Sequence, residues 1–186
     1  MASFNLLIAT VGRPTLVNQL RSLVTQLTAV DCLTVVFDGT AVQDLPIFKE
    51  FACEVSLHSE PTALGHWGHG IRNKYASLLK RRDFVLHGDD DDTYAPTAFE
   101  LLRSRCSDVE TLYVAQMRVP KLGLIPKGQV IKLNDIGTPC GIVPFDANQK
   151  STWMPRYGGD GEFYLAVQSL VKQVVFLNAL IYFVRS

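Results

Sequence analysis

Apolar runs of strand length alternate with longer segments of helical periodicity along most of this chain, and this alternation constrains the fold more than any other feature. Leu16, Leu20, Leu23 and Leu27 recur at three- and four-residue spacing, which gives one helix an apolar face. The run 33–37 has the length of a buried strand and ends at an Asp-Gly turn signal. Repeated alternation of such segments predicts an α/β fold.

The same patterns predict the individual elements. We expect strands at 4–10, 33–37, 54–57, 84–87 and 112–117, a short strand at 130–133 and two buried strands within 174–184. We expect helices beginning near Pro14 and at 42–51, 71–79, 95–105 and 163–170. No repeat or linker interrupts them, so we predict a single domain over residues 1–186.

Composition excludes several classes of protein. Hydrophobic residues make up 47% of the chain and charged residues 19%, as in an ordinary globular domain. Lys plus Arg equals Asp plus Glu at 18 each, so no net basic field would attract nucleic acid. The apolar stretch 174–184 is interrupted by Asn178 and is too short to span a bilayer.

The cysteines and the N-terminus indicate a reducing compartment. Cys32, Cys53, Cys106 and Cys140 lie far apart without a CxxC pair, which argues against a zinc site and against a disulfide framework. The N-terminus has no basic segment followed by a long apolar stretch, so we expect no signal peptide. We therefore expect reduced thiols and a cytoplasmic location.

Four adjacent carboxylates, Asp89 to Asp92, follow the apolar run 84–86. Their mutual repulsion has to be relieved by water or by a cation. The run lies where a buried strand would end, and open α/β sheets bind ligands at the carboxyl ends of their strands. Hard ions such as Mg²⁺ and Mn²⁺ take oxygen ligands, so we favour a metal site. The alternative is a solvated acidic turn that caps the following helix.

Five separated pieces of the sequence, taken in order, resemble the family-2-type inverting glycosyltransferases with the GT-A fold, in particular small viral or bacterial members. The pieces are 10–13 (TVGR), 37–39 (FDG), 72–73 (RN), 89–92 (DDDD) and 159–163 (GDGEF). The resemblance covers nearly the whole chain. It implies a mostly parallel central sheet flanked by helices, with a nucleotide-binding half at 1–92 and an acceptor-binding half at 93–186.

The resemblance also implies roles on the donor side. Tyr94 and Pro96 set the register in which 89–91 is the DxD motif. In that register Asp91 is the principal ligand of Mn²⁺ or Mg²⁺, and Asp89 lies beside the metal or the donor ribose. The remaining donor-binding candidates are Thr10, Arg13, Asp38 (for the nucleobase), Arg72 (for the diphosphate), Asn73 and Asp90. Structural alternatives remain open for Asp38 as a turn residue and for Arg13 as a surface residue.

The catalytic candidates lie near the start of a late helix. An inverting transfer needs a general base for the acceptor hydroxyl, and the resemblance gives that role to Asp160, with Glu162 as the alternative. The chain departs from the family pattern here, because Gly159 stands where the family usually has Glu. Acceptor-binding candidates are Trp153, Arg156 and Tyr157, because aromatic faces suit sugar rings.

Glycines surround two histidines in the segment 65–73, and glycine allows a ligand to approach the backbone closely. We interpret His66 and His69 as hydrogen-bonded or exposed rather than as a metal pair, because no further ligands stand at suitable spacing. Trp67 could stack on a sugar or pack in the core.

The resulting expectation is a metal-dependent inverting glycosyltransferase that moves a sugar from a nucleoside diphosphate, with UDP as the default, to a hydroxyl of a glycan or glycoconjugate. The chain could also be one domain of a larger transferase. The alternatives are a sugar-phosphate nucleotidyltransferase and a non-catalytic nucleotide-sugar-binding module. The first would normally carry more glycine and basic residues after its first strand than 10–14 provides.

Overall fold

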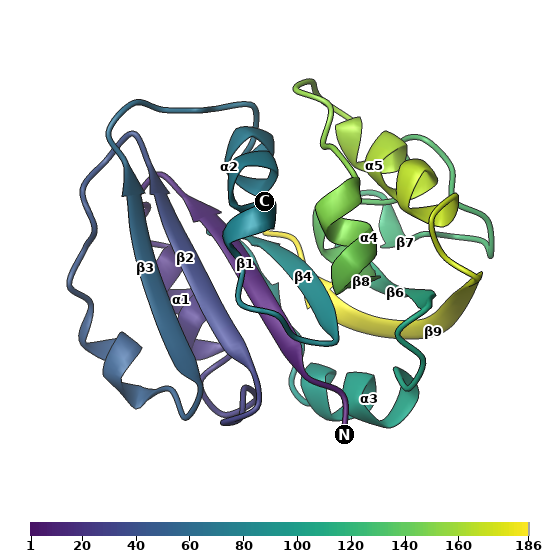
Figure 1. Ribbon diagram of the computed structural model, residues 1–186, viewed down its shortest axis with the longest axis horizontal. Coiled ribbons are helices and arrows are strands. Elements are labelled where there is room, and N and C mark those ends of the chain that lie inside the picture. Colours follow the sequence, from purple (N-terminus) through teal and green to yellow (C-terminus); the bar gives the residue numbers. More distant parts are fainter. Residues whose placement is uncertain (186) are drawn as a thin grey trace.

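The computed structural model describes residues 1–185, which form one nine-stranded sheet covered by short helices (Figure 1). The strand order is β3-β2-β1-β4-β8-β6-β9-β5, and β7 pairs with β6. The strands are β1 (Phe4–Thr10), β2 (Cys32–Asp38), β3 (Glu54–Glu60), β4 (Phe84–Asp89), β5 (Thr93–Tyr94), β6 (Thr111–Val119), β7 (Gly123–Ile125), β8 (Gly141–Pro144) and β9 (Gln173–Phe183).

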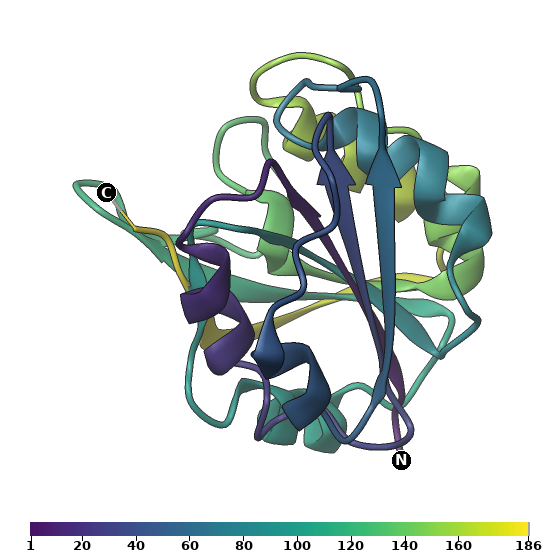
Figure 2. The ribbon, with the colours of Figure 1, turned by 90° about the vertical axis from the view of Figure 1, so that its left-hand side faces the viewer.

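The helices cover both faces of the sheet. In Figure 2, α1 and α2 lie on opposite sides of the strands of the N-terminal half. The α-helices are α1 (Leu16–Arg21), α2 (His69–Tyr75), α3 (Ala98–Arg105), α4 (Phe145–Lys150) and α5 (Gly159–Gln168). Three 3₁₀ turns are η1 (Pro46–Glu50), η2 (Ala76–Leu78) and η3 (Thr138–Cys140).

Alternate residues of β1 explain this layering. Leu6 and Ile8 belong to the same apolar cluster as Leu16 on α1, whereas Leu7 clusters with Ile71 on α2. Side chains alternate between the two faces of a strand, and all seven residues of β1 are buried. A strand buried on both faces reads as a continuous apolar run, which is why β1 begins and ends where the sequence predicted.

The sheet is mixed rather than mostly parallel, which corrects the sequence-based prediction while leaving the α/β class intact. The pairs β1–β2, β1–β4, β2–β3 and β6–β9 are parallel, and the other four are antiparallel. The two halves meet where β4 pairs with β8, through only Phe84↔Pro144 and Val85↔Val143. The antiparallel strands β7 and β8 come from an irregular segment in which the sequence showed only weak patterns.

Three other predicted elements differ from the structure. The helix expected at 42–51 is reduced to the 3₁₀ turn η1, which Pro46 opens. The strand expected at 130–133 is absent, and Val130 and Leu133 are exposed. The two strands expected within 174–184 are one strand, β9, whose pairing with β6 shifts register near Asn178, a residue with φ of 49°.

Two further expectations concern cysteines and membrane spans. All four cysteines are buried free thiols. Within residues 1–185, none of the helices has both the length and the apolar character needed to cross a membrane.

Candidate active site

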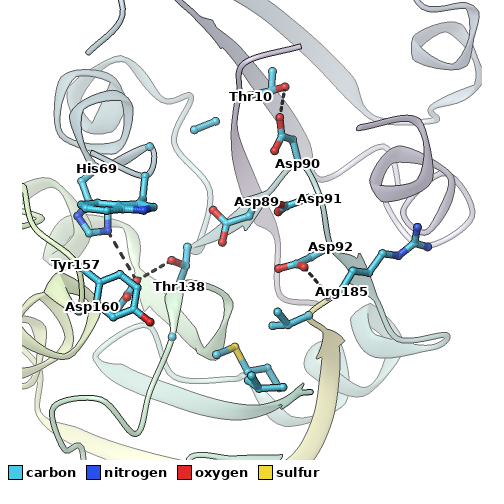
Figure 3. Close-up of a pocket in the computed structure, with 18 of the residues that line it drawn as sticks. Thr10, His69, Asp89, Asp90, Asp91, Asp92, Thr138, Tyr157, Asp160 and Arg185 are labelled. Carbon is cyan, nitrogen blue, oxygen red and sulfur yellow. Dashed lines mark hydrogen bonds and ion pairs between the residues drawn. The ribbon is translucent and has the colours of Figure 1, made fainter. Parts of the chain in front are cut away.

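A cavity of about 730 Å³ opens at the carboxyl ends of β1, β2 and β4 and extends across to η3, β6 and the start of α5 (Figure 3). Carboxylates line the β1–β4 side, which we call the donor side after the role that the sequence predicts for it. Thr138, Asp160 and Tyr157 line the opposite side, together with apolar residues from β6, β7 and the loops next to them. For the same reason we call it the acceptor side. These apolar residues are Met117, Val119, Leu122, Ile125 and Ile136.

Asp90 is fully occupied by protein donors. Its carboxylate accepts hydrogen bonds from Thr10 Oγ1 at 2.6 Å, from the backbone N–H of Val11 at 3.2 Å and from Arg13 Nη1 at 2.6 Å. Its side chain is only 3% exposed, and its charge raises the pKa of Arg13. Asp90 therefore fixes the turn after β1, and Thr10 and Arg13 reach the cavity as parts of that fixed turn.

Asp89 pairs with a buried arginine. Arg72 Nη2 lies 2.5 Å from Asp89 Oδ1, and Arg72 Nη1 donates to the carbonyl oxygen of Trp67 at 2.7 Å. Arg72 has no exposed surface, and its guanidinium lies 5.2 Å from the ring centroid of Trp153. Burial raises the pKa of Asp89, and the charge of Arg72 opposes that shift. A third of the Asp89 side chain stays exposed to the cavity.

Asp91 and Asp92 differ sharply in exposure. Asp91 is 49% exposed and, within residues 1–185, has one ion-pair partner, Arg13 Nη1 at 3.2 Å. Asp92 is buried and accepts the backbone N–H of Arg185 at 2.8 Å, and burial raises its pKa to about 7. Of the four aspartates, Asp89 and Asp91 therefore keep the most side-chain surface for a ligand.

Whether these aspartates could hold a divalent cation depends on which of their oxygens lack a protein donor. Within residues 1–185, no group of three or more His, Cys, Asp or Glu side chains is arranged to hold a metal ion. Arg72 bonds to Oδ1 of Asp89 and Arg13 to Oδ2 of Asp91, which leaves one oxygen of each without a donor in that part of the chain. Mg²⁺ is commonly bound by one or two carboxylates together with substrate phosphates and water. The pair fits such a shared site.

Asp38 holds the glycine-containing loop that forms one wall of the cavity. Its two oxygens accept the backbone N–H groups of Leu64 at 2.6 Å and Gly65 at 2.9 Å. The turn after it needs glycine, because Gly39 has φ of 71° and an added Cβ would lie 2.8 Å from that of Ala63. Asp38 lines the cavity. Its contact with a nucleobase stays a prediction.

Asp160 and Glu162 have different surroundings. Asp160 is the second residue of α5 and lines the cavity, and Thr138 Oγ1 donates to its Oδ1 at 2.6 Å. Figure 3 shows the hydrogen bond between Thr138 and Asp160 and the contact of Asp160 with His69. Glu162 does not line the cavity and is ion-paired with Arg156, whose hydrogen bonds lower its pKa.

Tyr157 alone of the three acceptor-side candidates lines the cavity, and it is 82% exposed. Trp153 lies in the core at 1% exposure, stacked on Phe163 with centroids 3.9 Å apart. Arg156 forms an ion pair with Glu162. Asn73, predicted to position the donor, instead bonds through both side-chain atoms to the backbone of Trp153, at 2.9 and 2.7 Å.

The structure adds residues that the sequence reasoning did not assign to the site. His69 lines the cavity with its Nε2 3.9 Å from Asp160 Oδ1, and Thr138 holds the same oxygen. The hydroxyl oxygen of Tyr182, in β9, accepts a hydrogen bond from the backbone N–H of Asp89 at 3.0 Å. In the sequence, the glycines around His69 were the only sign that it belongs to the site. Its contacts join residues that are 85 or more positions apart, and such contacts leave no local pattern.

Comparison with known proteins shows the class of fold. No protein-family model matches the chain, and no curated protein sequence matches it. Its structure is similar to that of S. aureus TarS residues 1–349, with a TM-score of 0.75 and 17% identity over 97% of this chain and 60% of that one. It is also similar to the same region of TarS in complex with UDP-GlcNAc (TM-score 0.75, 17% identity, 100% of this chain and 59% of that one). The complex of that region with UDP gives a TM-score of 0.72 at 19% identity.

The chain therefore has the mixed α/β fold of these TarS structures. It spans about 60% of the length of these TarS structures, and 37% of a longer TarS chain. At this low identity the likeness concerns the fold alone.

Proposed function

We propose that this chain is a nucleotide-sugar glycosyltransferase that inverts the anomeric centre and depends on Mn²⁺ or Mg²⁺. The observation that carries the proposal is that one cavity has Asp89 and Asp91 on its donor side and Asp160 on its acceptor side (Figure 3). A direct displacement needs a site for the leaving diphosphate and a base for the attacking hydroxyl, facing the same reacting carbon. The solved complexes of TarS with UDP and UDP-GlcNAc support a UDP-sugar as the donor.

On the donor side, Asp91 and Asp89 would hold the cation together with the diphosphate. When bound, the cation would neutralise the negative charge that develops on the departing nucleoside diphosphate. Arg72 holds Asp89 in place by their 2.5 Å contact and opposes the rise in its pKa that burial causes, and Asp90 keeps the Thr10–Arg13 turn in place. Asp38 would contact the nucleobase from the end of β2.

On the acceptor side, Asp160 would act as the general base. The acceptor oxygen attacks the anomeric carbon, the carbon–oxygen bond to the diphosphate breaks, and Asp160 takes the hydroxyl proton. Exposure to the cavity favours Asp160 over Glu162, because the carboxylate of Glu162 is already paired with Arg156. Tyr157 is the aromatic face that an acceptor sugar would contact.

A two-stage experiment tests the proposal. Thermal melting is recorded with nucleoside diphosphates and their sugars, with and without Mn²⁺, because a ligand that binds the folded state raises its stability. Release of nucleoside diphosphate is then followed with the stabilising donor over a panel of acceptor hydroxyls. Donor-specific, Mn²⁺-dependent stabilisation together with acceptor-dependent release supports the proposal. Pyrophosphate release from a nucleoside triphosphate and a sugar phosphate would instead identify a nucleotidyltransferase.

A further inference from the structure

His69, the first residue of α2, is buried against the base proposed above. Its side chain is 3% exposed and its Nε2 lies 3.9 Å from Oδ1 of Asp160 (Figure 3). The imidazole packs against Trp153 with ring centroids 5.3 Å apart. These contacts hold the His69 ring in a defined orientation, which determines the role of each ring nitrogen.

The other ring nitrogen fixes the tautomer. Nδ1 of His69 lies 2.7 Å from the backbone carbonyl oxygen of Met154, and a carbonyl oxygen can only accept. Nδ1 therefore carries the proton, and Nε2 of the neutral ring has only a lone pair. Nε2 and the Asp160 carboxylate are thus two acceptors that face each other without a proton between them. One added proton would favour a hydrogen bond between them, for which Nε2 and Oδ1 have to approach each other by about 1 Å from their 3.9 Å separation.

Gly159 makes room for this pair. A Cβ at position 159 would lie 2.5 Å from the Met154 carbonyl oxygen and 3.1 Å from Cε1 of His69. Any side chain there would displace the carbonyl group or the ring. Gly159 is also the position at which the sequence departs from the Glu of the family it resembles. The second titratable group beside Asp160 thus comes from α2 instead of from the residue before it.

The charges around His69 keep the ring neutral. Arg72 of the same helix and His87 of β4 are its nearest basic neighbours, and Asp89 and Asp160 are its acidic ones. Arg156, in the loop before α5, is neutralised by Glu162. Burial, the largest influence, and Arg72 lower the pKa of His69 more than the hydrogen bond to the Met154 carbonyl and the two aspartates raise it. A neutral imidazole is the form able to take up a proton.

We propose that His69 is the proton partner of Asp160: the proton that leaves the acceptor hydroxyl is bound by Asp160 and then held between its Oδ1 and Nε2 of His69. This rests on the proposed transfer reaction. The acceptor O–H bond breaks, a carboxyl O–H bond forms, and the same proton is shared with the imidazole lone pair until product leaves. His69 acts through Asp160 and is therefore a positioning residue.

The kinetic test uses His69→Asn, because an asparagine amide can still donate to the Met154 carbonyl but has no group equivalent to Nε2. His66→Asn is the matched control, since His66 is exposed and does not line the cavity. We expect kcat to fall about 10- to 100-fold in His69→Asn, at or below the lower limit of a general base's own contribution, because His69 acts through Asp160. We expect donor affinity to change less than 2-fold and the acidic limb of the kcat–pH profile to move to lower pH. Equal losses in kcat and donor affinity with an unmoved acidic limb would overturn the proposal.

A second measurement needs no turnover. The pKa of His69 is followed by NMR of the histidine Cε1–H resonances in the wild-type protein and in Asp160→Asn, with His69→Asn identifying the signal. We expect the pKa of His69 to fall in Asp160→Asn, because a negative charge beside Nε2 is removed. An unchanged pKa would sink the pairing of His69 with Asp160. Coupling without any sugar transfer would leave the pair intact and refute the proposed function instead.

Discussion

Carboxylates on the two sides of the cavity have very different partners. On the donor side, Asp90 accepts three hydrogen bonds from the turn after β1, and Asp89 is paired with a fully buried arginine. On the acceptor side, Asp160 accepts one bond from Thr138 and faces the unprotonated nitrogen of His69. Asp89 and Asp90 are thus held in place by protein donors, whereas Asp160 has fewer such partners and, in the proposed reaction, would take up the released proton.

The largest effect is expected from Asp160→Asn. The amide oxygen can still accept from Thr138 but cannot take a proton, so we expect kcat to fall about 10²- to 10⁴-fold, the usual contribution of a general base. Nucleoside diphosphate release with the best wild-type acceptor measures it. Glu162→Gln is the matched control and should stay within about 3-fold of wild type, below that range. The reverse ranking would move the base to Glu162.

The next largest effect is expected from Arg72→Met, which removes the guanidinium group that pairs with Asp89. Removing one partner of a buried ion pair costs about 3 to 5 kcal/mol, and the partial exposure of Asp89 places the expected loss near the lower limit. Urea titration measures the free energy of unfolding, with the exposed Arg105→Met as the control. Adding Asp89→Asn to Arg72→Met should recover part of the loss. No recovery would mean that packing against Trp153 matters more than the charge pair.

A smaller effect is expected from Asp91→Asn, because Asp91 is half-exposed and, in the proposed site, would act through its ligand instead of through the fold. We expect stability without ligand to change by less than about 0.5 kcal/mol, as for most surface substitutions. We expect the additional thermal stabilisation that Mn²⁺ confers in the presence of donor to disappear, and chelation of the metal to do the same to the wild-type protein. Unchanged Mn²⁺-dependent stabilisation in Asp91→Asn would remove it from the cation site.

The smallest effect concerns pH and Glu60, another paired carboxylate of the N-terminal half. Hydrogen bonds from Lys74, the larger influence, and from Tyr75 lower the pKa of Glu60 below its usual value. A carboxyl with a lowered folded-state pKa stabilises the protein above the unfolded-state pKa, about 4.3, and loses that contribution as the pH falls. Wild type should therefore exceed Glu60→Gln in stability at pH 7, and the difference should shrink below about pH 4.3. Denaturant titrations at several pH values, with Glu50→Gln as an exposed control, measure it.

Local patterns predicted the strands of the N-terminal half well, although not its helix at 42–51. The bounds of β1 and the burial of Leu16, Leu20, Leu23 and Leu27 follow from period and apolar character, which a sequence displays directly. The C-terminal half was predicted less well, because its strands pair antiparallel through short segments and β9 carries an irregularity at Asn178. Such pairing depends on long-range contacts, which no window of sequence displays.

The same distinction applies to the candidate site. The sequence predicted that 89–92 and Asp160 would carry the chemistry, and the structure brings both to one cavity. It did not predict that Trp153 would be buried or that Asn73 would bond to its backbone. A polar or aromatic residue near a motif can face the ligand or the core, and only packing decides between them. His69 was overlooked as a site residue for the same reason.

The short pairing between β4 and β8 has a consequence for how this fold can change in evolution. Beyond Val85 the two strands are no longer paired, although β4 continues to Asp89 on the donor side. The hydrogen-bonded pairs at Phe84 and Val85 therefore join the two halves of the sheet below the cavity, whereas Leu122 and Ile136 line the cavity from loops. Insertions or substitutions in those loops could exchange one acceptor for another without altering the β4–β8 pairing. Acceptor choice and chemistry could thus diverge independently within one scaffold.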